Sequence, residues 1–303
     1  MLRQDIKQYI DHHRAMGFKY RVQSYLLYNF ATFAEKQNDQ FVRCQTVLEW
    51  TGHAPSAAQR RNRLLTVRRF AIVMQAEDKR YQIPPAGAFG NNSFKRSIRH
   101  IFSPHEIKSL LIASKKLSPE KSIRPVTYST LFALLAATGL RISEALALSY
   151  KDFTSEGLII HATKFRKDRL VPLHRSSQKG LELYLNIRSG IQTIDEALFI
   201  SLYGTRLSYS RVNQTFLELI RSIGLRDTKA KKGLCINDLR HTFAVRSLEQ
   251  CVGNSEDIAH HMVALSTYLG HAHISDTYWY LQATPKLMKQ IAVVGEKLYR
   301  REQ

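Results

Sequence analysis

Residues 234–281, around which the rest of the chain can be interpreted, begin with Leu-Cys-Ile-Asn-Asp-Leu-Arg-His-Thr-Phe-Ala and end with Leu-Gly-His-Ala-His-Ile-Ser-Asp-Thr-Tyr-Trp-Tyr-Leu. In the first segment, Arg240 lies at the start of a helical pattern. In the second, His271 follows a glycine that favours the end of a helix, and Tyr280 lies nine positions after His271. The two segments therefore predict helices that carry an arginine, a histidine and a tyrosine.

A third segment, Thr-Gly-Leu-Arg-Ile-Ser-Glu-Ala-Leu at residues 138–146, adds a second arginine, Arg141. A tyrosine hydroxyl can attack a phosphodiester and form a covalent phosphotyrosyl enzyme, which keeps the bond energy for rejoining and needs no nucleotide cofactor. The attack places negative charge on the non-bridging phosphate oxygens, and two fork-shaped guanidiniums stabilise that charge better than lysine would. Tyr280 is therefore the candidate nucleophile, and Arg141 and Arg240 are the candidate phosphate ligands.

In this order, the segments around Arg141, Arg240, His271 and Tyr280 resemble the tyrosine recombinase (phage integrase) family over roughly residues 103–285. The Leu-Gly-His and Thr-Tyr-Trp-Tyr-Leu runs are similar to transposon-linked members. The resemblance implies a mainly α fold with a small β-sheet, in which a helical N-terminal DNA-binding arm domain precedes an α+β catalytic domain. It also implies that His271 binds a phosphate oxygen.

Residues 158–161 and 170–173 predict the two strands of a hairpin. This resembles the family's hairpin, in which the lysine that opens the turn, here Lys164, donates a proton to the departing 5′ oxygen. Lys167 is the alternative, and both lysines could instead contact phosphate. Phe165 stands where the family commonly has glycine, which leaves the shape of the turn open.

Asn237 stands where the family has the histidine of its His-x-x-Arg motif. Asparagine can form hydrogen bonds but cannot take a proton as histidine can. Two interpretations remain open. Asn237 either hydrogen-bonds the phosphate or the tyrosine, or it caps the helix that carries Arg240.

The composition indicates a folded protein with a polyanionic partner. The chain has 45 lysine and arginine residues against 25 acidic ones, a net charge of +20, and 44% hydrophobic residues. Double-stranded DNA is the first candidate for the partner. Because the chain has no apolar run of about 18 residues and no apolar leader, we expect no membrane association and a cytoplasmic, nucleoid-associated location. Cys44, Cys235 and Cys251 lack the spacing of a disulfide framework or a zinc ribbon and are expected to be reduced.

Helical periodicity and turn signals divide the chain near residue 100. Residues 1–82 predict a helical arm, 83–102 a basic linker, and 103–303 the catalytic domain, which ends in an amphipathic helix over 286–301. The catalytic domain opens with a capping box at Ser103-Pro104-His105-Glu106. The final helix packs on its own domain or, as the resemblance implies, docks on a neighbouring protomer.

The charge is concentrated in the arm, because residues 1–100 contain 17 basic and 7 acidic residues. The helix expected over residues 57–75 has an apolar stripe that includes Leu64, Val67 and Ile72, and no acidic residue accompanies its arginines before Glu77. A solvated face is the alternative, but we expect phosphate contacts from Arg60, Arg61, Arg63, Arg68 and Arg69. The basic linker residues Lys95, Arg96 and Arg99 are expected to touch DNA too.

Tyr278 and Tyr280 are two positions apart, so they point to different sides of a short helix. The spacing from His271 favours Tyr280 as the nucleophile and Tyr278 as a core residue, and the alternative is that the aromatic residues here only pack. Four histidines, His260, His261, His271 and His273, could suggest a metal. They lack cysteine or carboxylate ligands in register, so neither metal nor cofactor is expected.

The sequence therefore predicts a site-specific DNA recombinase or integrase, linked to transposition, that cuts and rejoins DNA through a 3′-phosphotyrosyl intermediate and a Holliday junction. It would act as a homo-tetramer on two DNA sites, with or without companion recombinases. One alternative is a type IB topoisomerase with similar chemistry. The other is a catalytically weakened DNA-binding partner of another recombinase, which Asn237 supports.

Overall fold

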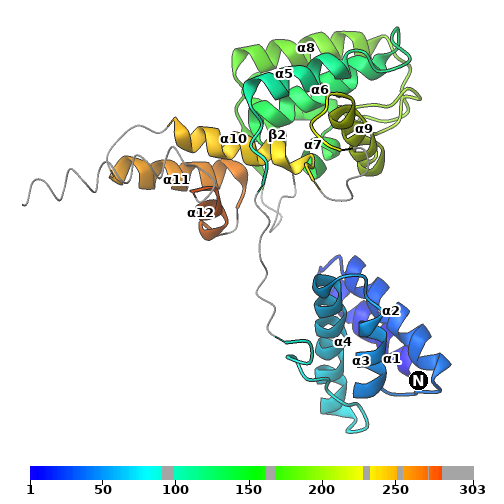
Figure 1. Cartoon of the computed structure of the whole chain (residues 1–303). Helices are drawn as coiled ribbons and strands as arrows, with labels where there is room; N and C mark the ends of the chain where they lie inside the picture. The colour runs from blue at the N-terminus through cyan, green and yellow to red at the C-terminus, as the bar shows by residue number, and fades with distance from the viewer. Residues whose placement is uncertain (91–98, 162–167, 228–232, 251–254, 272, 282–303) are drawn as a thin grey trace, which may run out of the picture. The chain divides into compact units, whose positions relative to one another are not determined.

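The computed structural model describes residues 1–90, 99–161, 168–227, 233–250, 255–271 and 273–281 (Figure 1). The chain is mainly helical with a small sheet, which confirms the predicted fold class, and it divides into two compact units, Met1–Ser97 and Ile98–Gln303. No helix in these ranges is long and apolar enough to span a membrane. Several predictions fall on residues outside the described ranges, namely those on Lys95, Arg96, Lys164, Lys167, Cys251 and the helix over 286–301.

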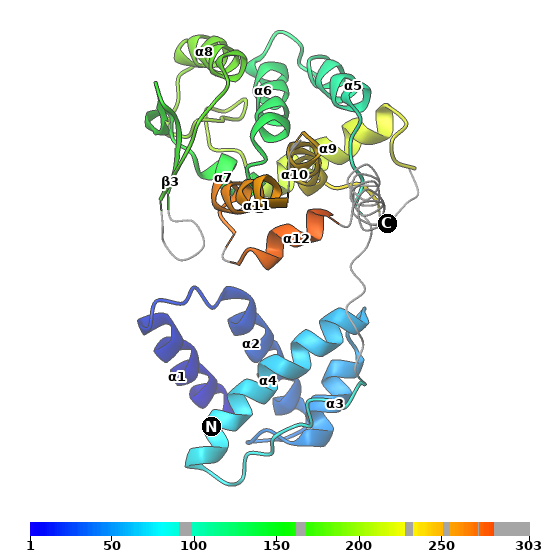
Figure 2. The same ribbon diagram turned by 90° about the vertical axis from the view of Figure 1, so that its left-hand side faces the viewer.

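The described part of the first unit is a helical bundle of α1 (Leu2–Ala15), α2 (Arg21–Lys36), α3 (Cys44–Gly52) and α4 (Ala57–Glu77) (Figures 1 and 2). Its core is formed by apolar residues at helical spacing, including Ile10, Phe30, Val67 and Phe70, which are fully buried. Ile72, predicted to lie in the apolar stripe of α4, is 45% exposed. That prediction is wrong because Ala71, four positions after Val67, completes the buried face and the next residue turns away from it.

Helix α6 (Ile123–Thr138) lies at the centre of the second unit, packed against α5 (Pro104–Ser114), α8 (Arg175–Ser189) and α10 (Asn237–Glu249) (Figure 1). The predicted capping box of α5 is present, because the Ser103 hydroxyl accepts from the Glu106 backbone at 3.1 Å and the Glu106 carboxylate accepts from the Ser103 backbone at 2.6 Å. Helix α6 ends at Gly139 in the left-handed conformation, with φ 62°. A Cβ there would lie 2.4 Å from the Phe243 ring, so both backbone and space require glycine.

The small sheet consists of β1 (Phe153–Thr154), β2 (Gly157–Ile160) and β3 (Arg169–Val171), paired antiparallel in that order after a short 3-10 helix, η1 (Tyr150–Asp152). Leu158 pairs with Val171 and Ile160 pairs with Arg169. The predicted hairpin is confirmed, with Arg169 in the strand instead of the turn. The two-residue strand β1 was not predicted, because so short a segment carries no period.

The remaining helices of the second unit are α7 (Ile142–Ala147), α9 (Tyr209–Ser222), α11 (Ser255–Leu269) and α12 (Ser275–Leu281). Figure 2 shows α11 and α12 beside α10, and the three helices share a core that includes Val245, Leu248, Met262, Leu265 and Tyr280. Gly270 ends α11 with φ 66° and turns the chain back towards α10. This reversal brings the segment 269–281 to the segment that carries Arg240.

Candidate active site

Arg141 lies at the corner between α6 and α7. One of its guanidinium nitrogens donates to the Glu144 carboxylate at 2.7 Å, and its backbone N–H donates to the other carboxylate oxygen at 3.0 Å. These bonds hold the Arg141 guanidinium against the Glu144 carboxylate. A second guanidinium nitrogen donates to the carbonyl of Gly270 at 3.1 Å. Arg141 is therefore held at both ends of its fork, by its own corner and by the turn after α11.

Arg240, in the first turns of α10, connects all three sequence segments. It is only 7% exposed and donates to the carbonyls of Gly139 and Leu269, both at 2.7 Å, and to Nε2 of His271 at 3.1 Å. Burial, and then the charge of Arg141, lower the pKa of Arg240, but a guanidinium remains protonated at neutral pH. The structure therefore brings two positive charges together, and no carboxylate among the described residues is bonded directly to Arg240.

His271 is held in one tautomer by its two neighbours. Because Arg240 can only donate, Nε2 of His271 is the acceptor of that bond, and the proton is on Nδ1, which donates to the Thr277 hydroxyl at 2.7 Å. Burial, and then the charges of Arg240 and Arg141, lower the pKa of His271 to about 4. The imidazole is therefore neutral at pH 7 and orients the Arg240 guanidinium.

This environment makes the stability of the fold depend on pH. Folded His271 stays neutral down to a pH of about 4, whereas an unfolded histidine takes a proton near its ordinary pKa of about 6.5. The unfolded state thus binds more protons between these values, and the free energy of unfolding falls as the pH is lowered through this window. We expect His271→Asn to lose less stability than the wild type between about pH 7 and about pH 5, as measured by urea unfolding.

The exposed residue His260 supplies the matched control for this experiment. His260→Asn should keep the pH dependence of the wild type. An equal loss of stability in wild type and His271→Asn would contradict the assignment of a depressed pKa to His271.

Tyr280 is 4% exposed and packs between two histidines. Its ring lies nearly parallel to that of His271, with the centroids 6.0 Å apart, and 5.4 Å from the ring of His241. It also raises the pKa of Arg240, against the effect of burial. Tyr278 is 50% exposed, so its prediction as a core residue is wrong. The physical reason is that α12 buries the face of Thr277 and Tyr280, three positions apart, and turns Tyr278 to solvent.

Asn237 is the first residue of α10, and its side chain is exposed. The capping interpretation is wrong, because Ile236 occupies the cap position and no side chain caps the helix there. Instead, the Asp238 carboxylate accepts from the backbone N–H of Cys235 at 2.8 Å. The other interpretation, in which Asn237 hydrogen-bonds the phosphate or the tyrosine, stays a prediction.

Two residues of this site were missed by the sequence analysis. Thr277 is fully buried, and its hydroxyl holds the His271 ring in place. In the sequence, the one sign of this role is that Thr277 is a hydroxyl residue three positions before Tyr280. Arg169 donates to Glu144 at 2.8 and 3.2 Å from a position 25 residues away in the chain. No local spacing shows such a contact.

The arm arginines of α4 divide into two groups. Arg60 lies over the Phe89 ring at 5.3 Å, Arg63 donates to the Trp50 carbonyl at 3.2 Å and lies over its ring at 5.0 Å, and Arg68 donates to the Pro84 carbonyl. These three side chains therefore have packing roles within the arm. Arg61 and Arg69 are exposed, and these two are best placed for a phosphate backbone.

Arg99, predicted to touch DNA from the linker, belongs to the second unit. Its guanidinium lies 3.8 Å from the Asp238 carboxylate and 3.5 Å from the Cys235 sulfur. Burial, and then the charge of Asp238, raise the pKa of the Cys235 thiol, which agrees with a reduced packing cysteine. Arg99 thus packs at the start of α10, and its contact with DNA stays a prediction.

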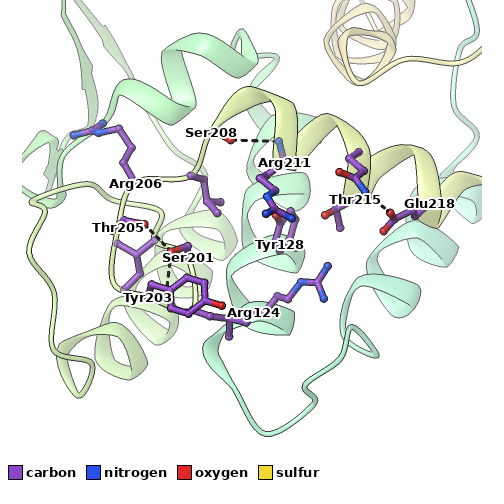
Figure 3. Close-up of a pocket in the computed structure, with 14 residues that line it drawn as sticks. Arg124, Tyr128, Ser201, Tyr203, Thr205, Arg206, Ser208, Arg211, Thr215 and Glu218 are labelled. Carbon is purple, nitrogen blue, oxygen red and sulfur yellow. Dashed lines mark hydrogen bonds between the residues drawn. The ribbon is translucent and has the colours of Figure 1, made fainter.

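A pocket of about 500 Å³ lies elsewhere in the second unit, between the first turns of α6 and α9 (Figure 3). Arg124 and Tyr128 of α6 face Arg211 and Thr215 of α9 across it, and Tyr203 lies at its edge. None of the catalytic candidates that the structure describes is among its lining residues. The pocket is therefore separate from the site around Arg141 and Arg240.

The chain is similar to known integrases and recombinases. The model of the Phage integrase family matches residues 100–286. "Putative integrase/recombinase y4rB" of Sinorhizobium fredii (strain NBRC 101917 / NGR234) is 38% identical over 299 residues, which cover 95% of this chain and 95% of that protein.

Two solved structures share the fold. The first is the XerH site-specific recombinase bound to palindromic difH substrate in a post-cleavage complex, with a TM-score of 0.66 at 19% identity. The match covers 90% of this chain and 78% of the XerH chain. The Tn1549 transposon integrase in complex with transposon right end DNA has a TM-score of 0.67 at 15% identity. That match covers 95% of this chain and 98% of the integrase chain. With the family model over residues 100–286 and a relative matched along nearly its whole length, the chain belongs to the phage integrase family of tyrosine recombinases.

Proposed function

We propose that this chain is a site-specific DNA recombinase that cuts and rejoins DNA through a covalent bond to Tyr280. The observation that supports this most is that Arg141, Arg240, His271 and Tyr280, from three separate sequence segments, meet in one network of contacts, in which Arg240 and Tyr280 are buried. Tyrosine recombinase membership gives the reaction class. The DNA-bound relatives, XerH and the Tn1549 integrase, support double-stranded DNA as the substrate.

The chemistry follows from the charges of the site. The Tyr280 oxygen attacks the scissile phosphorus, the bond from phosphorus to the 5′ oxygen breaks, and a 3′-phosphotyrosyl link and a free 5′ hydroxyl result. Arg141 and Arg240 stabilise the negative charge on the non-bridging oxygens, and the fixed geometry around them avoids reorganisation during the reaction. Lys164 donates a proton to the departing 5′ oxygen. Asn237, exposed at the start of α10, hydrogen-bonds the phosphate or the tyrosine.

Recombination requires the free 5′ hydroxyl to attack the phosphotyrosyl link of a partner duplex. Four protomers on two DNA sites would exchange one pair of strands, pass through a Holliday junction and exchange the second pair. A type IB topoisomerase would instead relax supercoiled plasmid as a monomer on a single duplex. Relaxation without any joining of two sites would favour that alternative.

Replacing Asn237 with histidine tests whether the chain is an enzyme or a catalytically weakened DNA-binding partner. A tyrosine with a pKa of about 10 is mostly protonated at pH 7, and asparagine cannot accept its proton. If the two guanidiniums suffice to favour the phenolate, wild type should form a covalent adduct with a nicked suicide DNA site. Asn237→His should then speed cleavage modestly, by no more than the roughly 100-fold to 10,000-fold contribution usual for one acid or base group.

His241 is the control for this comparison, because it packs on Tyr280 and its buried Nδ1 has no hydrogen-bond partner among the described residues. His241→Ala should mainly lower the free energy of unfolding. An adduct that forms with Asn237→His but never with wild type, at any pH, would make the natural chain a DNA-binding partner and not an enzyme.

The arm should bind phosphates through the exposed arginines of α4. We expect the double change Arg61→Ala and Arg69→Ala to reduce the slope of log affinity against log salt by about 0.9 for each DNA phosphate that the variant no longer neutralises. Arg63→Ala should chiefly destabilise the arm, because that side chain packs on Trp50. Titrations of a duplex at several salt concentrations measure the slopes, and an unchanged slope in the double variant would mean that this face of α4 is only solvated.

A further inference from the structure

We propose that Arg169 is a positioning residue for DNA cleavage, which acts through Glu144 on Arg141. The inference rests on the proposed function and adds to it a residue outside the segments around Arg141, Arg240, His271 and Tyr280. Arg169 is the first residue of β3 and pairs in register with Ile160 of β2. The sheet therefore fixes the backbone of Arg169 independently of the helices that carry the other site residues.

The geometry is a closed set of contacts around one carboxylate. Glu144 accepts from two guanidinium nitrogens of Arg169, at 2.8 and 3.2 Å, and from Arg141 through its side chain at 2.7 Å and its backbone at 3.0 Å. The side chain of Glu144 is only 10% exposed and that of Arg169 only 12%. A carboxylate with this many donors, and so little solvent, has a single orientation.

Gly270 completes the set. A Cβ at this position would lie 2.6 Å from a guanidinium nitrogen of Arg169, so the Arg169 side chain lies directly against the turn after α11. The carbonyl of the same glycine accepts from Arg141 at 3.1 Å. Arg169 therefore contacts both groups that hold Arg141, the Glu144 carboxylate and the Gly270 turn, without any described contact to Arg141 itself.

The charges explain why a second arginine is needed. Glu144 alone would neutralise Arg141 and weaken its attraction for a phosphate. Arg169 shares the carboxylate, so the two arginines and one glutamate keep a net positive charge beside the scissile phosphate. Burial alone would raise the pKa of Glu144, but the bonds from Arg169 and Arg141 outweigh burial and lower it, so the carboxylate stays ionised.

The test compares Arg169→Met and Arg169→Lys with wild type in single-turnover cleavage of a suicide site by the full chain. We expect Arg169→Met to cleave about 10-fold to 100-fold more slowly, because misplacing a charged group by about 1 Å costs up to about that much. Arg169→Lys should recover part of the rate. DNA affinity should change little. Arg206→Met is the matched control, since Arg206 is bonded to the Leu146 carbonyl and to Asp195 and not to the site.

A second readout does not depend on cleavage. The pKa of Glu144, followed by carboxyl ¹³C NMR and assigned by the loss of its signal in Glu144→Gln, should rise in Arg169→Met and stay unchanged in Arg206→Met. Wild-type cleavage together with an unchanged rate in Arg169→Met would overturn the inference and leave the proposed function intact. Absence of cleavage by the wild type would refute the proposed function instead. In that case an unchanged Glu144 pKa in Arg169→Met overturns the positioning role, and a raised one supports it.

Discussion

Tyr280→Phe should abolish covalent attachment to DNA altogether, the largest effect expected of any single change in this chain. Phenylalanine keeps the ring that packs between His271 and His241, so the core shared by α10, α11 and α12 should persist. The hydroxyl is the only group removed, and its oxygen is the atom that we propose forms the phosphotyrosyl bond. The measurement is a denaturing gel of protein incubated with a nicked suicide site.

Tyr278 provides a matched control on the same helix. It is half exposed, two positions from Tyr280, and carries the same hydroxyl. Tyr278→Phe should therefore retain the adduct at close to the wild-type level. An adduct that survives in Tyr280→Phe and disappears in Tyr278→Phe would move the nucleophile to the exposed tyrosine and show that the spacing from His271 had been misinterpreted.

Arg240→Lys should produce the second largest effect, a fall of about 100-fold to 1,000-fold in the single-turnover cleavage rate, as is typical when one preorganised donor to a developing oxyanion is removed. Lysine keeps the charge but not the fork that reaches Gly139, Leu269 and His271 at once. Buried carbonyls without donors should also lower the free energy of unfolding by about 1 to 3 kcal/mol.

Arg246 distinguishes these two consequences, because it lies on the same helix and donates to the Phe102 carbonyl at 2.7 Å without touching the site. Arg246→Lys should lose stability but keep most of its cleavage rate under conditions in which both variants are folded. Equal rates for Arg240→Lys and Arg246→Lys would show that Arg240 serves the fold alone.

The electrostatic design of the site combines fixed positive charge with neutral neighbours. Arg141 and Arg240 stay charged, while burial and these arginines keep His271 neutral at pH 7. A neutral imidazole can accept a hydrogen bond from Arg240 and so hold its fork in place. A protonated imidazole would lose that bond and repel the guanidinium, which gives one physical reason for the low pKa.

The helices of the arm and of the catalytic unit could be predicted because apolar periodicity and capping signals are local. Ser103 with Glu106 is an example in which a few neighbouring residues determine where a helix begins. The spacing from His271 to Tyr280 likewise lies within one turn and one short helix. These features needed no knowledge of tertiary structure.

The features that could not be predicted depend on contacts between distant residues. Arg169 meets Glu144 across the sheet, and Thr277 meets His271 only after the chain reverses at Gly270. Capping was one of the two interpretations left open for Asn237, but α10 begins one residue earlier than that role requires, with Ile236 at the cap position. Spacing along the sequence also misplaced Tyr278 and Ile72, since burial is decided by which face of the helix meets a neighbour.

The most direct test of the account is to identify the residue that carries DNA. The covalent complex formed by the full chain on a suicide site would be digested with protease and nuclease, and the nucleotide-linked peptide sequenced by mass spectrometry. We expect the modification on Tyr280, attached through a 3′ phosphate, with a free 5′ hydroxyl on the released strand. Attachment to Tyr278, attachment through a 5′ phosphate, or the absence of any linked peptide would contradict the account.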